Sequence, residues 1–326
     1  MPRRLQLIGI VLTASLFSID AHGIELLKND ESRLRLMGWF RGRYVVEDPA
    51  DGDLIHNSRI RMARINAVYE HYRWGGAVIQ VEGNRGDILL LDGFGRITPI
   101  KDLEIRAGFF PTRIAQDTQL PLPSLPFGES PQSIRSGLVP FRLLGVEVGR
   151  RIHFDDLTVL LNVGVHNPPE ELPNPNGKLI SAFARARLAS GVAAHASFVA
   201  LVGSDNPGGA ERPLAYDQQL SASVSYDKNG TRAYLEGLAV LSASAVKTPF
   251  SVYAWLSHQF AVSDIALVPG IRYEVIRPAE DVLHQLTAAI NLLAIGWRMA
   301  TAISYELTLG PSDTGHAGFI QLQVGF

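Results

Sequence analysis

The 326-residue sequence contains no cysteine. Because it has no thiols, it can form neither a disulfide framework nor a thiolate zinc site, and a small secreted domain held together by disulfides is excluded. Its charge is nearly balanced, with 30 lysines and arginines against 32 aspartates and glutamates. Without an overall excess of positive charge, the sequence offers no broad surface for nucleic acid, and we expect no nucleic-acid partner.

Long apolar runs are also missing beyond residue 23. A helix that crosses a membrane needs about 20 consecutive apolar residues, and this part of the sequence provides none. The only other structure that can span a bilayer is a closed β-barrel. Because no Gly/Ser linker or charge block divides the chain, we expect a single domain over residues 24–326.

Recognisable catalytic motifs are missing as well. The histidines stand singly, and the sequence contains neither His-Glu-x-x-His nor Gly-x-Ser-x-Gly. The sequence therefore predicts no catalytic residue, no cofactor site and no metal site, and we do not expect an enzyme.

The first 23 residues have the pattern of a secretory signal peptide. Arg3 and Arg4 precede the apolar run Leu5–Phe17, and small residues follow at Ala21 and Gly23, where a signal peptidase reads. The apolar run is too short to anchor the chain in a membrane, so we predict that residues 1–23 are removed on export. This removal takes away two positive charges and one negative charge, so the formal net charge changes from −2 to −3.

Apolar and polar residues alternate with period two through most of the remaining sequence, which is the pattern of β-strands. Between Leu34 and Val46, for example, Leu34, Leu36 and Phe40 fall on one face. Segments of about ten residues suit tilted strands that cross a bilayer, and bacterial barrels have an even number of them. We count sixteen segments: 34–46, 58–71, 74–83, 88–98, 102–110, 142–153, 157–166, 178–189, 193–203, 215–227, 230–242, 249–260, 264–277, 282–293, 296–309 and 317–326.

The connections between these segments alternate between tight turns and longer loops rich in Pro, Gly, Asn and Asp. A transmembrane barrel has short turns on the periplasmic side and long loops outside, whereas a soluble β-sandwich has no reason to place its long loops at one end. The tight turn Asp227-Lys228-Asn229-Gly230 fits a hairpin that requires positive φ. The predicted fold class is therefore all-β, a transmembrane antiparallel barrel of about 16 strands.

The stretch 111–141 is the one long interruption of this pattern. Its prolines exclude a central strand or a long helix, and loops of about thirty residues are uncommon unless functional. Apolar residues within it, such as Phe127 and Leu138, need cover. We therefore predict that this third external loop folds into the barrel as a constriction loop; a surface flap or an unstructured linker is the alternative.

The chain ends in a strand-like segment whose apolar face carries Ile320, Leu322, Val324 and Phe326. A final strand ending in phenylalanine resembles the signal by which outer-membrane barrels are recognised for insertion. It implies the barrel-assembly machinery as a partner and the bacterial outer membrane as the location.

Four segments resemble the phosphate-selective porin O/P family: 59–65 (RIRMARI), 78–82 (VIQVE), 103–112 (LEIRAGFFPT) and 139–148 (VPFRLLGVEV). The resemblance covers about a third of the chain and rests on order and spacing. It implies a water-filled channel in a Gram-negative outer membrane, assembled as a homotrimer, with arginines along the lumen that draw in small anions such as phosphate.

Guanidinium groups suit phosphate, and a row of cations inside a low-dielectric wall concentrates anions. The alternative is that these arginines are rim charges or ion-pair partners of Glu70, Glu82, Glu104 and Glu147. The candidate pore-lining residues are Arg35, Arg41, Arg43, Arg59, Arg61, Arg106, Arg113, Arg135, Arg142, Arg185 and Arg187.

The sequence departs from this family in one respect. Lysines contribute to the constriction of its phosphate-binding members, but no lysine lies between Lys101 and Lys178 here. General or weakly anion-selective diffusion is therefore the favoured function. A plugged structural or adhesive barrel and an outer-membrane hydrolase remain as alternatives.

Overall fold

The structure is a computed structural model. It describes residues 23–48, 54–84, 87–115, 126–127, 129–136, 138, 142–168, 177–202, 218–241, 248–278, 281–294, 299–311 and 314–325. The predicted signal peptide, apart from Gly23, lies outside the described residues, as does the C-terminal Phe326. Export and recognition by the assembly machinery therefore stay predictions.

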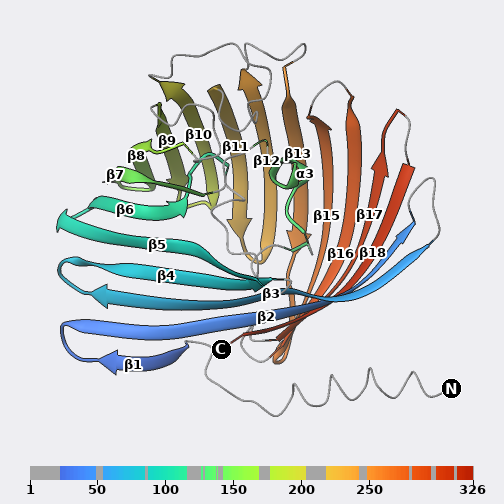
Figure 1. Cartoon of the computed structure of the whole chain (residues 1–326), viewed down its shortest axis with the longest axis horizontal. Coiled ribbons are helices and arrows are strands. Elements are labelled where there is room, and N and C mark those ends of the chain that lie inside the picture. Colours follow the sequence, from blue (N-terminus) through green and yellow to red (C-terminus); the bar gives the residue numbers. More distant parts are fainter. Residues whose placement is uncertain are drawn as a thin grey trace.

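Antiparallel strands close into one barrel of sixteen strands (Figure 1). Each strand pairs with the next along the chain, and β18 pairs with β2 to close the sheet. β13 and β14 count as one interrupted strand, because both pair with β15. The strands are β2 (Ser32–Asp48), β3 (Ile55–His71), β4 (Gly75–Asn84), β5 (Asp87–Ile100), β6 (Leu103–Pro111), β7 (Arg142–Phe154), β8 (Leu157–His166), β9 (Lys178–Leu188), β10 (Val192–Val202), β11 (Gln218–Lys228), β12 (Thr231–Leu241), β13 (Phe250–His258), β14 (Phe260–Val262), β15 (Ile265–Arg277), β16 (Leu283–Ala294), β17 (Met299–Leu309) and β18 (Thr314–Gly325).

The sixteen predicted segments correspond in order to these sixteen strands, and no strand end differs from its prediction by more than three residues. The predicted fold class is confirmed. A short additional strand, β1 (Ile24–Lys28), was not predicted. It pairs with Arg33–Leu36 of β2. The pairing of β2 with β18 ends at Trp39, so β18 does not reach this N-terminal part of β2. β1 therefore covers part of an edge that would otherwise be open.

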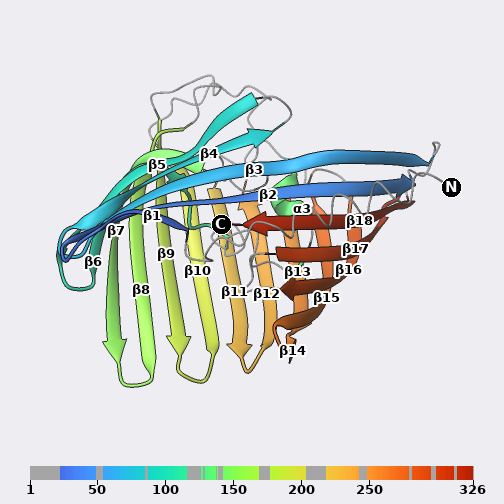
Figure 2. The same ribbon diagram turned by 90° about the horizontal axis from the view of Figure 1, so that it is seen from below.

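The tight turns behave as the sequence predicts. Asn229 and Gly230 have φ angles of 53° and 77°, and Lys228 faces Thr231 across the hairpin. Positive φ at both central residues is the type I′ geometry that matches the twist of adjoining strands. In Figure 2 the tight turns that join β7 to β8, β9 to β10 and β11 to β12 lie along one edge of the barrel. We call this the short-turn end.

The two faces of the wall are chemically opposite. On β11, Leu220 and Val224 point outward and are 44% and 53% exposed, while Gln219 and Ser221 point inward and are buried. Polar side chains thus fill the interior and apolar side chains cover the outside, which is the reverse of a soluble β-sandwich and typical of a transmembrane barrel. Among the described residues, no helix is long and apolar enough to cross a membrane.

Aromatic rings mark the outer face towards the long-loop end. Three outward tyrosines each pair through the hydroxyl with Nδ1 of a histidine on the next strand, at 2.5–2.9 Å. Aromatic girdles of this kind border the apolar band of membrane barrels. The pairs are Tyr44–His56, Tyr273–His284 and Tyr305–His316.

Candidate functional site

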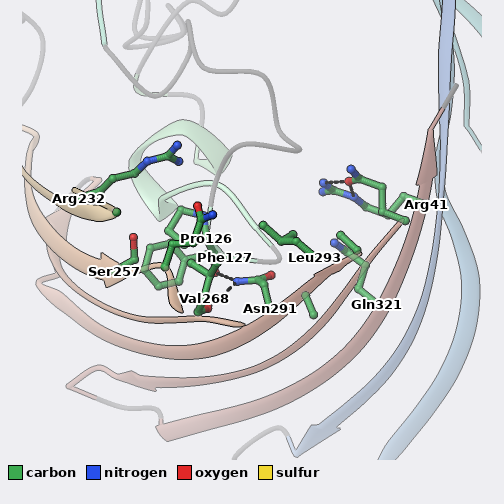
Figure 3. A pocket seen from close by; sticks show the side chains of 14 residues that line it. Arg41, Pro126, Phe127, Arg232, Ser257, Val268, Asn291, Leu293 and Gln321 are labelled. Carbon is green, nitrogen blue, oxygen red and sulfur yellow. Dashed lines mark hydrogen bonds between the residues drawn. The ribbon is translucent and has the colours of Figure 1, made fainter. Parts of the chain in front are cut away.

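The described residues of the loop between β6 and β7 lie inside the barrel. Asn291 of β16 donates a hydrogen bond from Nδ2 to the carbonyl oxygen of Pro126, at 2.6 Å (Figure 3). From another part of the same wall, Gln219 of β11 donates from Nε2 to the carbonyl oxygen of Leu138, at 2.7 Å. Because both side chains point inward, the predicted inward folding of this loop is confirmed for its described residues.

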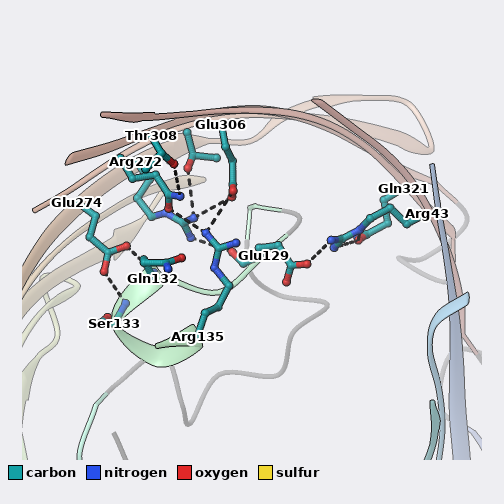
Figure 4. Close-up of polar contacts among 12 residues, drawn as sticks. Arg43, Glu129, Gln132, Ser133, Arg135, Arg272, Glu274, Glu306, Thr308 and Gln321 are labelled. Carbon is teal, nitrogen blue, oxygen red and sulfur yellow. Dashed lines mark hydrogen bonds and ion pairs between the residues drawn. The ribbon is translucent and has the colours of Figure 1, made fainter. Parts of the chain in front are cut away.

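A buried carboxylate holds the middle of the loop. Glu274 of β15 accepts hydrogen bonds from the backbone nitrogens of Gln132 (2.6 Å) and Ser133 (2.8 Å), which begin the one-turn helix α3 (Gln132–Arg135) (Figure 4). The first N–H groups of a helix have no partner within it, so a carboxylate there satisfies both. Glu274 is completely buried and also accepts from Ser251 Oγ, at 3.0 Å.

Ion pairs fasten the end of α3 to the same wall. Arg135 Nη2 lies 3.2 Å from the carboxylate of Glu306 on β17, and the same nitrogen donates to Gln285, at 3.0 Å. Arg272 of β15 donates from Nη1 to the carbonyl oxygen of Glu129, at 2.8 Å, and its guanidinium lies 4.9 Å from the ring centre of Phe127. The loop backbone and its charged side chains are therefore both attached to β15–β17.

Glu129 attaches the loop to β2 and β3. Its carboxylate forms a close ion pair with Arg43 and lies 3.3 Å from Arg61 Nε. Arg61 is the extra residue of a β-bulge, since Arg41 faces Met62 while the next residue of β2 faces Ile60; a bulge redirects the side chain it carries. Burial would raise the pKa of Glu129, but the charges of Arg43 and Arg61 outweigh burial and lower that pKa to about 2.

Apolar side chains of the loop are covered by the wall behind it. Ile114, Ala115 and Leu138 pack in one buried cluster with Leu143, Leu179, Val199, Leu238, Val240 and Ile276. Phe127 packs in a second cluster with Tyr234, Tyr253, Trp255 and Ala289. Beside Phe127, the space towards Arg41 and Gln321 is a cavity of only about 40 Å³ (Figure 3), which is room for a few waters. We call the wall that the loop contacts the loop-covered region.

A different part of the lumen stays open. Three polar cavities of about 720, 370 and 490 Å³ follow one another along the inner wall from β3 to β9, near the short-turn end. The first two share Arg96 and Glu104, and the last two share Arg151 and Leu160. We call this connected polar space the short-turn mouth.

Most of the predicted arginines have a carboxylate partner. Three of the four glutamates named as alternative partners, Glu70, Glu104 and Glu147, form ion pairs with candidate arginines, so that alternative holds for these three. The pairs of candidate arginines are Arg35–Glu70 (3.1 Å), Arg106–Glu147 (2.6 Å), Arg113–Glu147 (3.2 Å), Arg113–Glu104 (3.6 Å), Arg142–Asp92 (2.7 Å), Arg135–Glu306 (3.2 Å), and Arg43 and Arg61 with Glu129. Glu82 pairs with Arg64 instead, whose Nε lies 2.9 Å away.

The other candidates have no carboxylate partner among the described residues. Arg41 donates to the amide oxygen of Gln323, at 2.6 Å. Arg59, Arg185 and Arg187 are within ion-pair distance of no carboxylate in the part of the chain that the structure describes. That any of these arginines acts on a passing ion stays a prediction.

Sequence reasoning missed several charged residues of the interior. Arg151 shares the inward face of β7 with Glu147, and strict period-two counting from Glu147 would have found it. Arg272 and Glu274 alternate with the outward residues Ile271 and Tyr273 and could have been found in the same way. Their partners on the loop had no sequence signal.

The hydrolase alternative has one structural counterpart. His195 contacts Ser223 through Nδ1 and lies 3.3 Å from Glu236 through Nε2. However, Ser223 is 6% exposed and Glu236 is 1% exposed, and Glu236 also accepts hydrogen bonds from Ser221 (2.6 Å) and Tyr234 (2.7 Å). The group is a packed polar network in the wall, with no reacting atom open to a substrate. Within the described ranges, no cluster of His, Cys, Asp and Glu is suited to a metal ion.

The sequence matches no protein-family model, and no curated protein matches it either. Solved structures resemble it in fold. OmpF of Salmonella typhi, in complex with daunomycin, has a TM-score of 0.69 at 12% identity, with 93% of this chain and 100% of that chain covered.

An anion-selective porin from Comamonas acidovorans has a TM-score of 0.67 at 11% identity, with 91% of this chain and 100% of that chain covered. The outer membrane protein OmpT of Vibrio cholerae, folded in vitro, has a TM-score of 0.61 at 13% identity, with 93% of this chain and 100% of that chain covered. At these identities the likeness concerns the fold alone. The chain thus has the fold of an outer-membrane porin.

Proposed function

We propose that the protein is an outer-membrane porin, a water-filled channel through which small solutes diffuse passively, with anions favoured over cations. The observation that carries this proposal is the combination of a loop fastened inside the barrel with a connected polar space left beside it. A fastened loop narrows the lumen without filling the short-turn mouth. No chemical step is needed for this function, in keeping with the expectation that the protein is not an enzyme.

The charge of the lumen supports the preference for anions. Where the loop meets the wall, the arginine is the more exposed member of two ion pairs: Arg61 is 35% exposed against 10% for Glu129, and Arg135 is 29% exposed against 6% for Glu306. Arg43 is an exception, because it is fully buried. Water in the narrow part therefore meets mainly guanidinium groups, which attract anions inside a low-dielectric wall. The scarcity of lysine argues for a weak preference among small anions, phosphate included, over phosphate selectivity.

The outer face supports an outer-membrane location. Its apolar band and its tyrosines fit a bilayer, and export would remove residues 1–23 and use Phe326 for insertion. A homotrimer is part of this proposal. One structure of Vibrio cholerae OmpT with the same fold is described as a trimer form, with a TM-score of 0.59 at 12% identity.

The test is electrical. Purified protein in a planar lipid bilayer under a KCl gradient is expected to show unitary conductance and a zero-current potential of the anion-selective sign. Absence of unitary conductance would overturn the proposal in favour of a plugged structural or adhesive barrel, which the two apolar clusters around the loop favour. Hydrolysis of phospholipid or peptide by the same preparation would support the alternative function, an outer-membrane hydrolase.

A further inference from the structure

On the basis of the proposed channel, we propose that the anion-binding site of the lumen lies at the short-turn mouth, where Arg151, Arg185 and Arg187 form a site for a tetrahedral oxyanion such as inorganic phosphate. The narrow part beside the loop would then restrict the size of solutes and weakly favour anions, while the mouth would bind the anion directly.

The register of three neighbouring strands brings these residues together. Leu160 of β8 faces Arg151 of β7 on one side and Arg185 of β9 on the other. Thr158 of β8 similarly separates His153 of β7 from Arg187 of β9. In each case the β7 and β9 backbones are about 10 Å apart, which is two strand spacings. Long side chains from both strands can therefore reach one ion between them.

These residues border a cavity of about 490 Å³, which all three arginines line. This volume falls within the range of small-molecule sites. Arg185 Nε is buried and has no hydrogen-bond partner. A buried donor without an acceptor is costly, and a bound oxyanion would supply one.

Acidic residues near the site do not neutralise the arginines. Asp155 and Asp156 line the same cavity, yet among the described residues no carboxylate is within ion-pair distance of Arg151, Arg185 or Arg187. Asp102 lies 3.5 Å from His153 Nε2. The guanidinium groups are therefore available to an incoming ion.

The narrow part differs in this respect. Arg43 and Arg61 are bound to Glu129, and Arg135 is bound to Glu306. An oxyanion binding there would have to compete with a fixed carboxylate for the same N–H groups. Because guanidinium binds oxyanions best through two parallel hydrogen bonds, the uncommitted arginines of the mouth are the better ligands.

Arg150 provides a matched control for the test. It is the neighbour of Arg151 on β7 and carries the same charge, but it faces outward, opposite Leu161. Arg150→Gln therefore removes a charge at the same height of the barrel without touching the lumen. Arg185→Lys keeps the charge of the site and removes the forked geometry.

The experiment measures phosphate binding to the detergent-purified protein by isothermal titration calorimetry at fixed ionic strength. Arg151→Gln and Arg185→Gln are each expected to weaken phosphate binding by about ten- to a hundredfold, the loss expected for a charged hydrogen-bond donor. Arg150→Gln should bind as the unchanged protein does, and Arg185→Lys should lie between. Far-UV circular dichroism of each variant confirms that the barrel has formed.

Other outcomes separate this inference from the proposed function. If Arg61→Gln loses phosphate binding while Arg151→Gln keeps it, the site is in the narrow part and the inference is wrong, although the channel stands. The inference also fails if the unchanged protein conducts with anion selectivity but binds no phosphate. Phosphate binding without unitary conductance would instead refute the proposed channel, while the proposed binding site would stand.

Discussion

The loop-covered region and the short-turn mouth are built from the same kind of wall and differ in what their inward polar groups do. In the loop-covered region, Gln219, Glu274 and Asn291 each bind the loop backbone, and the space left beside Phe127 is about 40 Å³. At the mouth, Arg185 and Arg187 bind no carboxylate in the described chain, and cavities of about 370 to 720 Å³ remain. Inward polarity alone therefore does not keep the lumen open; polar space of this size remains where the loop does not cover the wall.

The largest effect is expected from breaking the apolar attachment of the loop. Leu138 is 1% exposed and packs against the wall, so Leu138→Ala should lower the free energy of unfolding by about 4 kcal/mol. Urea unfolding in detergent, followed by tryptophan fluorescence, measures the change. Leu256→Ala, a 50% exposed leucine on the outer face, is the control and should cost much less in micelles. Equal losses in the two variants would contradict a loop-covered core.

Acid should release the loop from β2 and β3. The pKa of Glu129 is lowered from 4.5 to about 2, so its ion pairs stabilise the attached loop fully above pH 4.5 and lose their effect as the pH falls towards 2. The lowering corresponds to roughly 3 kcal/mol of attachment. Conductance should be constant between neutral pH and pH 5 and become larger or noisier below pH 4. Glu129→Gln should show this behaviour already at neutral pH, and a titration unchanged by that substitution would contradict the assignment.

A smaller effect is expected at the start of α3. Glu274→Gln keeps the size of the side chain but replaces one acceptor oxygen with an amide that faces a backbone N–H, which should cost about 2 kcal/mol. Limited proteolysis within 111–141 reports the detachment. Gln285→Glu, which adds a carboxylate beside Arg135 on the same wall, should not increase cleavage.

The smallest effect concerns charge in the narrow part. Arg61→Gln removes one charge from a group that still contains Arg43 and Glu129. A unit charge about 10 Å from a passing ion in water contributes roughly 0.4 kcal/mol, so the anion-to-cation permeability ratio should fall by about a factor of two. Reversal potentials in a KCl gradient measure the ratio. A complete loss of selectivity would mean that the arginines beside the loop, and not those of the mouth, cause the preference for anions.

The sequence predicted the wall well because each strand meets lipid on one face and a polar interior on the other, which keeps the period-two pattern intact. It also predicted the inward loop, since prolines prevent a strand and Phe127 and Leu138 need cover. β1 was missed because Ile24–Lys28 has no alternation. The partners of the loop had no sequence signal: Gln132 and Glu274 are 142 residues apart, and only the closed barrel brings them together.

The most direct test of the proposed channel is the single-channel conductance and zero-current potential of the purified protein in a planar bilayer under a KCl gradient. We expect discrete conductance steps with an anion-selective potential, which Arg61→Gln lowers and does not abolish. Absence of conductance steps would contradict a water-filled channel, and a cation-selective potential would contradict a lumen governed by its uncommitted arginines.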